Sequence, residues 1–349
     1  MGEARPHLLG LHPEDLVAHL RGAGVAIGAD AARRVLAHAV MRGLPGYPRS
    51  RPVSRAVEAA VDRLVDRRPI EIIERATDPV DGFVKYLFRM HDGALAEAVR
   101  IPLEAPGRFT VCVSSQVGCA MGCRFCATAR LGFSRHLAAW EIVAQVMAVR
   151  AEAPGRVTGV VFQGQGEPLH NYDAVMRAAA ILSHPCGGSI TGRAITVSTV
   201  GVVPGILRMA RETHPWRLIV SLTSAIEEKR RQLIPTGTKW SVAEIAEAAK
   251  TYQRAKGERL TIAWVMLGGV NHGPDEIEAL GSLFRGVPLR FNIIDVNDAR
   301  PDGFRRVTPT ELDRFRDALW ALGFPVVRRY SGGFAKHAAC GMLASVSAA

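Results

Sequence analysis

Three cysteines stand close together in the run Cys119-Ala-Met-Gly-Cys123-Arg-Phe-Cys126. Three thiolates on one short loop can hold three irons of a cubane [4Fe-4S] cluster. No fourth cysteine lies nearby in the sequence to hold the last iron, which would stay open to another ligand. The spacing therefore predicts an iron–sulfur cluster bound by Cys119, Cys123 and Cys126, with one iron available for chemistry.

A structural zinc site is the main alternative for such a loop, and a loop of buried inert cysteines is another. Structural zinc takes four closed ligands, commonly from two separated pairs of cysteines. The remaining cysteines, Cys112, Cys186 and Cys340, form no second pair. We therefore favour the iron–sulfur cluster over zinc.

The composition is typical of an intracellular enzyme. With 349 residues, 48% of them hydrophobic, the chain can bury a large core. Six cysteines are too few for a secreted protein stapled by disulfides, and an oxygen-sensitive cluster suits a reducing compartment. Residues 1–20 contain no apolar signal-peptide segment, and no run reaches the ~18 apolar residues of a membrane helix. We expect a cytoplasmic monomer that does not contact membranes.

The charge balance favours a nucleic-acid partner. The formal net charge is +11, with 44 lysines and arginines. Such a field attracts phosphate backbones, although an arginine-rich surface can also serve solubility alone. Two groups of arginines are candidates for phosphate contact: Arg130 and Arg135 after the cysteine loop, and Arg300, Arg305 and Arg306 after an expected strand.

Two kinds of pattern divide the chain. From about residue 10 to residue 90, apolar residues recur at helical spacing. Beyond residue 92, β-rich runs at 109–115, 157–163, 194–198, 218–221, 260–267, 290–295 and 326–329 alternate with helical patterns at 138–150, 172–183, 242–256, 275–284 and 311–322. This alternation predicts an α/β protein with right-handed βαβ units and a parallel sheet, either doubly wound or a full or partial barrel.

Several candidate ligand-binding residues follow directly after expected strands. One such strand runs into Gln163-Gly-Gln-Gly-Glu-Pro168, where Gly166 allows close approach of the backbone to a ligand and Glu167 offers a carboxylate. Ser198 and Ser221 end the next two strands. A tight turn and ordinary strand-end serines are the alternative interpretation. In parallel sheets, however, ligands bind at the carboxyl ends of the strands, where all of these residues are expected.

Longer motifs around these positions resemble the RlmN/Cfr family of radical S-adenosylmethionine adenosine methyltransferases. The similarity covers most of the chain from Phe83 to Leu343. Its main segments are Cys112-Val-Ser-Ser-Gln-Val-Gly-Cys119, Gly164-Gln-Gly-Glu-Pro-Leu169, Ser198-Thr-Val-Gly-Val-Val-Pro204 and Ala338-Ala-Cys340-Gly. The resemblance implies a partial (βα)6 radical-SAM barrel with a small N-terminal helical domain. We place an RNA-contacting helical domain at residues 1–92 and the catalytic domain at residues 93–349.

The resemblance also implies the cofactors. The open iron of the [4Fe-4S] cluster would chelate S-adenosylmethionine, and an electron from the cluster would cleave it to a 5'-deoxyadenosyl radical. Two S-adenosylmethionine molecules would be used per turnover, and a flavodoxin or ferredoxin would donate the electron. By their places in the motifs, the residues that bind S-adenosylmethionine are Gly166, Glu167, Ser198, Ser221 and Asn297.

Members of that family methylate an adenine ring carbon, a position too electron-poor to attack a sulfonium methyl group. By resemblance, Cys340 accepts a methyl group and carries it as a methylene radical that adds to the adenine. Cys112 then forms a disulfide with Cys340 to release the product, while Glu97 removes the ring proton. The implied substrate is carbon 2 of an adenosine in 23S ribosomal RNA, and the carbon-2 enzymes also act on transfer RNA.

The sequence departs from the family pattern around these residues. The departures are Gln165 in the glycine-rich loop, Thr223 after Ser221, and Lys336 and His337 before Cys340. They leave open a divergent paralogue that methylates carbon 8 or another RNA. Two further classes are a radical enzyme that is not a methyltransferase, such as a lyase or maturase, and an RNA-binding module with a structural cluster. Cys186 matches no motif, and we regard it as structural or incidental.

Overall fold

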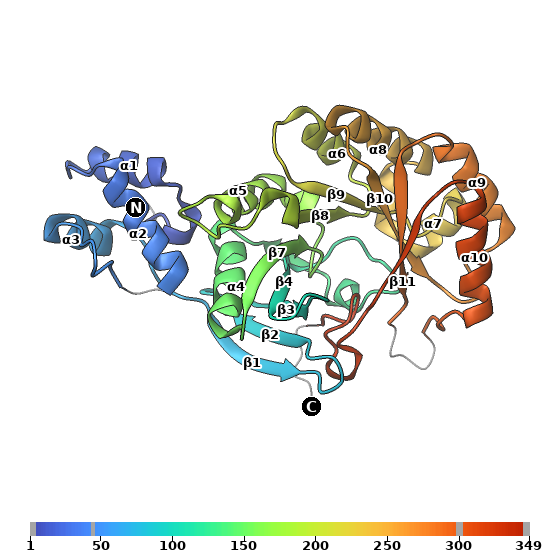
Figure 1. Cartoon of the computed structure of the whole chain (residues 1–349), viewed down its shortest axis with the longest axis horizontal. Helices are drawn as coiled ribbons and strands as arrows, with labels where there is room; N and C mark the ends of the chain where they lie inside the picture. The colour runs from blue at the N-terminus through green and yellow to red at the C-terminus, as the bar shows by residue number, and fades with distance from the viewer. Residues whose placement is uncertain (1–4, 43–45, 298–302, 345–349) are drawn as a thin grey trace.

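A ten-stranded sheet forms the centre of the protein (Figure 1). The structure, a computed structural model, describes residues 5–42, 46–297 and 303–344. One end of the sheet is antiparallel and consists of β1 (Glu71–Thr77), β2 (Val84–Arg89) and β3 (Leu95–Pro102). Beyond β4 (Arg108–Val113) every neighbouring pair is parallel, through β7 (Arg156–Phe162), β8 (Ile195–Thr199), β9 (Arg217–Ser221), β10 (Leu260–Met266), β11 (Leu289–Asp295) and β12 (Val326–Arg329).

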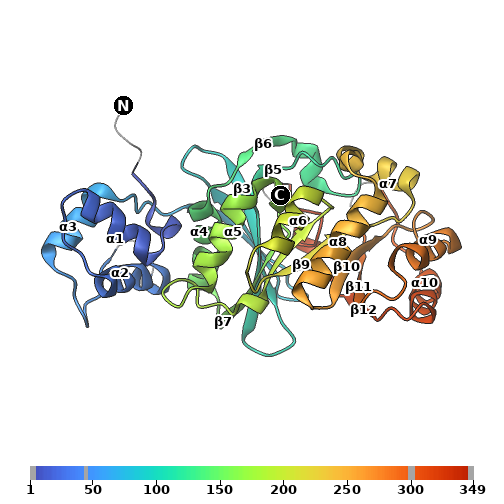
Figure 2. The same ribbon diagram turned by 90° about the horizontal axis from the view of Figure 1, so that it is seen from above.

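Helices connect the parallel strands, which confirms the predicted α/β partial barrel. They are α4 (Ala139–Glu152), α5 (Tyr172–Ser183), α6 (Val203–Arg211), α7 (Glu227–Leu233), α8 (Val242–Lys256), α9 (Pro274–Phe284) and α10 (Pro309–Ala321). Figure 2 shows α4, α5, α6 and α8 following one another along the outer side of the sheet. Strand β12 extends the six-stranded parallel array by one strand, in register with β11. Within the described residues, no helix is both long and apolar enough to cross a membrane.

Local sequence explains where these helices begin and end. Helix α8 starts at a reciprocal capping box, in which Ser241 accepts from the backbone of Glu244 and Glu244 accepts from that of Ser241. It stops at Gly257, whose φ of +66° suits glycine. Helix α10 begins with the same box at Thr308 and Glu311.

The N-terminal helices form a separate lobe at one end of the molecule (Figure 1). They are α1 (Pro13–Gly22), α2 (Ala29–Arg42) and α3 (Arg55–Leu64). The expectation that helical structure continues to residue 90 is wrong, because residues 71–89 form β1 and β2. Strand β2 is buried along most of its length, and the resulting continuous apolar run does not distinguish a strand from a helix by periodicity.

The helical lobe is attached to α4 and α5. The His7 ring stacks on Trp140 of α4, with centroids 3.9 Å apart. Arg177 of α5 donates to the carbonyl of Gly10 at 3.2 Å and pairs with Asp15 at the start of α1. The lobe therefore lies beside the first two βα units of the barrel.

Candidate active site

One cavity lies at the carboxyl ends of the parallel strands, where the sequence predicts a ligand. Its wall includes residues from the ends of β4, β8, β9, β10, β11 and β12 and from the loop that directly follows β7. The predicted site residues in this wall are Cys112, Cys119, Cys123, Cys126, Gly166, Glu167, Ser198, Ser221, Asn297 and Cys340. Segments more than 200 residues apart in the chain thus meet at one site.

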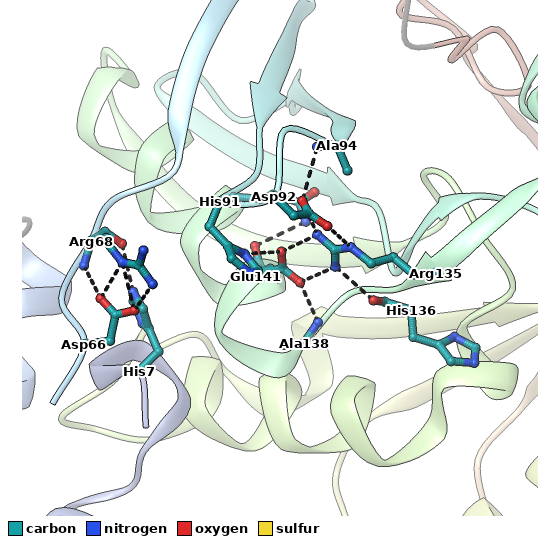
Figure 3. Close-up of polar contacts among 11 residues, drawn as sticks. His7, Asp66, Arg68, His91, Asp92, Ala94, Arg135, His136, Ala138 and Glu141 are labelled. Atoms are coloured by element: carbon teal, nitrogen blue, oxygen red, sulfur yellow. Dashed lines mark hydrogen bonds and ion pairs between the residues drawn. The ribbon is translucent and has the colours of Figure 1, made fainter. Parts of the chain in front are cut away.

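The cysteine loop is framed on one side by a short hairpin of β5 (Gln116–Gly118) and β6 (Phe133–His136). Arg135 on β6 donates to the Asp92 carboxylate at 2.6 and 2.9 Å and to Glu141 at 2.8 Å (Figure 3). Glu141, buried at the start of α4, also accepts from the backbone of Ala138. This network holds the hairpin against the sheet, so the two ends of the cysteine loop are fixed in position.

The other side of the cysteine loop rests on the segment after α7. Arg124 donates its backbone N–H to the carbonyl of Leu233 at 3.0 Å. Thr236, in the short helix η5 (Pro235–Lys239), donates its hydroxyl to the carbonyl of Ala120 at 2.9 Å. Met121 of the loop and Ile234 belong to the same buried apolar cluster. These contacts fix the loop backbone independently of any bound group.

The three loop thiols suit a cationic group. Burial raises the pKa of Cys119 to about 11 and that of Cys123 well above its usual value, and neighbouring thiols add to both shifts. Thiolates crowded in this way are stabilised by metal, which deprotonates its sulfur ligands. Within the described residues no three histidine, cysteine or acidic side chains converge on a single ion. A cubane, with its irons at separate corners, fits three thiols that face one cavity without meeting at a point.

The glycine-rich loop after β7 approaches the hairpin closely. At Gly166, which has φ of +99°, a Cβ would lie 2.6 Å from the Cβ of Gln116, so only glycine fits. Gln116 accepts the backbone N–H of Glu167 at 2.8 Å. The Glu167 carboxylate accepts from the backbones of Leu169 at 3.0 Å and Val200 at 2.9 Å, while burial raises its pKa to about 6.

A C-terminal segment brings Cys340 over the cysteine loop. Ala127 donates to the carbonyl of Gly341 at 2.7 Å, and the Thr128 hydroxyl donates to that of Leu343 at 2.6 Å. Asn297 donates its amide to Ser331 at 2.6 Å and to the carbonyl of Cys340 at 3.3 Å. The residue predicted to bind S-adenosylmethionine therefore also secures the segment that carries Cys340.

The two outlying cysteines line the same cavity, Cys112 from β4 and Cys340 from the C-terminal segment. Burial, with a smaller contribution from the nearby Cys340 sulfur, raises the pKa of Cys112 to about 12. Cys340 is exposed as a residue, but its sulfur is buried in the cavity wall, and this burial raises the pKa of the Cys340 thiol. The positive charge of Arg329 lowers both values.

Sequence analysis missed two polar residues beside Cys340. Gln163 Nε2 donates to Cys340 Sγ at 3.8 Å, and Arg329 Nη1 donates to Gln163 Oε1 at 3.0 Å. Because Arg329 has only donors, it fixes the amide with its nitrogen toward the sulfur. Gln163 directly follows β7 and Arg329 is the last residue of β12, and these positions at strand ends were the available signal.

If Cys340 accepts a methyl group, as the resemblance implies, replacing Gln163 by leucine is expected to slow that transfer. The variant keeps the side-chain size but loses a hydrogen bond worth about 1 kcal/mol, or roughly five-fold in rate. The measurement is the rate at which Cys340 gains 14 Da in tryptic peptides after S-adenosylmethionine is added. Gln232→Leu, on the exposed face of α7, is the matched control. Equal rates of Cys340 methylation in the Gln163→Leu and Gln232→Leu variants would contradict the positioning role of Gln163.

Glu97 is the predicted site residue that the structure does not place in the cavity wall. It lies on β3, fully buried behind the glycine-rich loop. Its carboxylate pairs with Lys85 of β2 at 3.1 Å and accepts from Gln165 Nε2 at 3.1 Å. The carboxylate is therefore engaged by groups of the protein and does not itself line the cavity.

Several arginines expected to contact phosphate are engaged with the protein instead. Arg135 is held by Asp92 and Glu141. Arg305 pairs with Glu311 at 2.6 Å, and Arg306 donates to Asn297 Oδ1 at 2.6 Å. Arg300 lies outside the described residues. These side chains therefore organise loops around the site, and the sequence clusters alone do not identify an RNA surface.

Comparison with known proteins gives a consistent picture. Residues 113–281 match the Radical SAM superfamily. A probable RNA methyltransferase of Anaeromyxobacter sp. (strain Fw109-5) is 48% identical over 341 residues, covering 97% of this chain and 98% of that protein. A probable dual-specificity RNA methyltransferase RlmN of Synechococcus sp. (strain ATCC 27144) is 40% identical over 280 residues, covering 78% of each chain. The solved structure of a radical SAM methyltransferase from Sphaerobacter thermophilus matches with a TM-score of 0.89 and 35% identity, covering 98% of this chain and all of that one.

Proposed function

The chain belongs to the RlmN/Cfr family of radical SAM RNA methyltransferases, and from that premise we propose that it methylates carbon 2 of an adenosine in 23S ribosomal RNA. Transfer RNA is the second substrate we propose, since the RlmN relatives are named as dual-specificity enzymes. One observation carries the proposal: Cys112 and Cys340 line the same cavity as the three cysteines of the loop. A radical enzyme that cleaves S-adenosylmethionine for another purpose has no use for this pair.

We assign the binding of a [4Fe-4S] cluster to Cys119, Cys123 and Cys126. The cluster, when bound, supplies the electron that cleaves S-adenosylmethionine, and a flavodoxin or ferredoxin replenishes it. The backbone at Gly166 and the side chains of Ser198, Ser221 and Asn297 surround the space next to the loop. We propose that they bind S-adenosylmethionine, with Glu167 fixing the strand ends around it.

Cys340 acts first in this proposal. Its thiolate accepts a methyl group from one S-adenosylmethionine, and the methyl carbon, after losing a hydrogen atom to the radical from a second molecule, forms the bond to adenine. The unpaired electron of this adduct would return to the cluster and the ring proton would pass to a base, which leaves a closed-shell thioether on Cys340. Cys112 then attacks the Cys340 sulfur, making a disulfide and breaking the sulfur–carbon bond. The electron pair of that bond passes to the departing carbon, which takes up a proton to become the new methyl group.

Removal of the ring proton is the role we propose for Glu97. Glu97→Gln is expected to slow release, so that the covalent protein–RNA adduct accumulates where the unmodified enzyme shows little. Denaturing gel electrophoresis with labelled RNA measures the adduct. Glu104→Gln, on the exposed turn between β3 and β4, is the control. Because the substitution also alters a buried partner of Lys85, thermal melting of both variants is compared. Turnover at the original rate with no adduct would assign the base elsewhere.

The substrate is tested by nucleoside mass spectrometry of ribosomal and transfer RNA from a deletion strain. The proposal predicts loss of 2-methyladenosine, restored by the gene encoding this chain but not by its Cys340→Ala variant. Loss of 8-methyladenosine would instead assign the carbon-8 reaction. No missing methyladenosine of either kind would indicate a substrate other than these RNAs. A loop adenine is the expected target, because a base stacked in a duplex is shielded from the cavity.

A further inference from the structure

An aromatic side chain stands open to solvent at the mouth of the active-site cavity. Tyr330 belongs to the cavity wall, yet 69% of the residue is exposed. It directly follows β12 and begins the segment that leads to Cys340. Large aromatic rings normally gain stability by burial, so an exposed ring at a binding site has a surface available to a ligand.

The structure holds this ring in place although it is exposed. The Tyr330 hydroxyl donates to Asp81 Oδ2 at 3.1 Å, and the same oxygen accepts the backbone N–H of Gly333 at 2.8 Å. The ring meets Phe83 edge-on, with centroids 6.3 Å apart. A Cβ on Gly332 would lie 2.6 Å from Tyr330 Cε1, so the ring packs directly against the backbone. Little conformational freedom remains to be lost when a ligand binds.

The flanking charges suit a polyanion. Arg329 lies in the cavity wall. Arg328, two residues before Tyr330, is exposed and donates one hydrogen bond to Asp295 Oδ2 at 2.7 Å. The nearest carboxylate, Asp81, is engaged by the hydroxyl and by Gly333. A fixed aromatic ring next to arginines is the combination with which proteins bind unpaired nucleotides, the ring stacking on the base and the cations facing the backbone.

We propose that Tyr330 is a stacking platform for the unpaired nucleobase next to the adenine that enters the cavity. The inference rests on the proposed function, because it requires an RNA loop at this cavity. The target adenine has to pass inward to reach Cys340. The Tyr330 ring at the mouth of the cavity therefore contacts the base next to the target adenine in the RNA chain. Stacking is tolerant of base identity, and Tyr330 thus positions the loop without reading its sequence.

The test uses an RNA hairpin that the wild-type holoenzyme methylates, with 2-aminopurine placed at each loop position in turn. Binding of the wild-type protein should quench the fluorescence at one position next to the target. Tyr330→Ala should abolish that quenching and weaken binding on the order of ten-fold. Tyr330→Phe keeps the ring and should retain both signals. Trp320→Ala, which removes a comparably exposed ring (52%) from α10 away from the cavity, is the matched control.

The outcomes separate this inference from the proposed function. Unchanged quenching and affinity in Tyr330→Ala, on an RNA that the wild-type protein methylates, would overturn the stacking role alone. Equal losses in Tyr330→Ala and Tyr330→Phe would also overturn it, because the hydroxyl rather than the ring would then matter. A wild-type protein that neither binds nor methylates any RNA loop would overturn the proposed function and the stacking role together.

Discussion

The Cys112→Ala variant is expected to form the carbon–carbon bond to adenine and then fail to release it, so that RNA accumulates covalently on the protein. The physical reason is that the sulfur–carbon bond to Cys340 is broken only when a second thiol attacks the sulfur. Cys112 lines the same cavity as Cys340, and the Cys340 sulfur is near enough to raise the pKa of Cys112. Gel electrophoresis under denaturing, non-reducing conditions, followed by mass spectrometry of the Cys340 peptide, measures the adduct.

The Cys340→Ala variant should form no adduct and no methylated RNA, since the residue that carries the methyl group is gone. Its thermal melting should match that of Cys112→Ala, which excludes unfolding as the cause. The reverse pattern, with adduct only in Cys340→Ala, would exchange the two assignments. Full turnover by both variants would leave a radical enzyme that does not use this thiol pair.

Alanine at Cys119, Cys123 or Cys126 is expected to reduce cleavage of S-adenosylmethionine to background. In the proposed cluster each thiolate holds one iron, and a cluster that loses a ligand loses either its integrity or its open site. Anaerobic reconstitution followed by iron and sulfide analysis, and assay of 5'-deoxyadenosine, measure the effect. The unmodified protein should contain about four irons and four sulfides per chain.

Cys186→Ala is the matched control for the cluster variants. Cys186 is half-buried beyond the end of α5 and is absent from the cavity wall. Its variant should keep iron content and cleavage unchanged. Stoichiometric zinc without iron in the anaerobically purified protein would contradict the cluster assignment itself.

The sequence predicts the catalytic half of the fold well because its pattern is strongly periodic. The expected strand at 260–267 appears as Leu260–Met266, and the expected helix at 172–183 has the bounds Tyr172–Ser183. Parallel strands are buried on both faces and their helices are amphipathic, so local composition reveals both. The order of motifs along the chain then predicts which residues share the carboxyl edge of the sheet.

The features that the sequence did not predict depend on contacts between distant segments. Nothing near Gln163 indicates that Arg329, 166 residues away, orients its amide toward Cys340. The charge of Arg135 predicts phosphate contact, whereas Asp92 and Glu141 take up its donors. The motif of Glu97 predicts a catalytic carboxylate, but only the structure shows Lys85 beside it and the glycine-rich loop in front of it.

The partial barrel has a consequence for the size of molecule that it can handle. Among the described strands, none pairs β12 with the antiparallel end of the sheet, which leaves a seam between the two ends. The Cys340 segment crosses this seam, and its backbone donates one hydrogen bond to Asp81 and one to Asp78. Within the described residues the seam is therefore closed by loop contacts and by the apolar cluster of Phe83, Val99, Ala338 and Leu343, and by no ladder between strands. A closed barrel would admit a ligand only along its axis. An open seam leaves a second side from which a ligand can approach the cavity, so the proposed attachment to Cys340 is compatible with a nucleotide that remains part of a folded RNA.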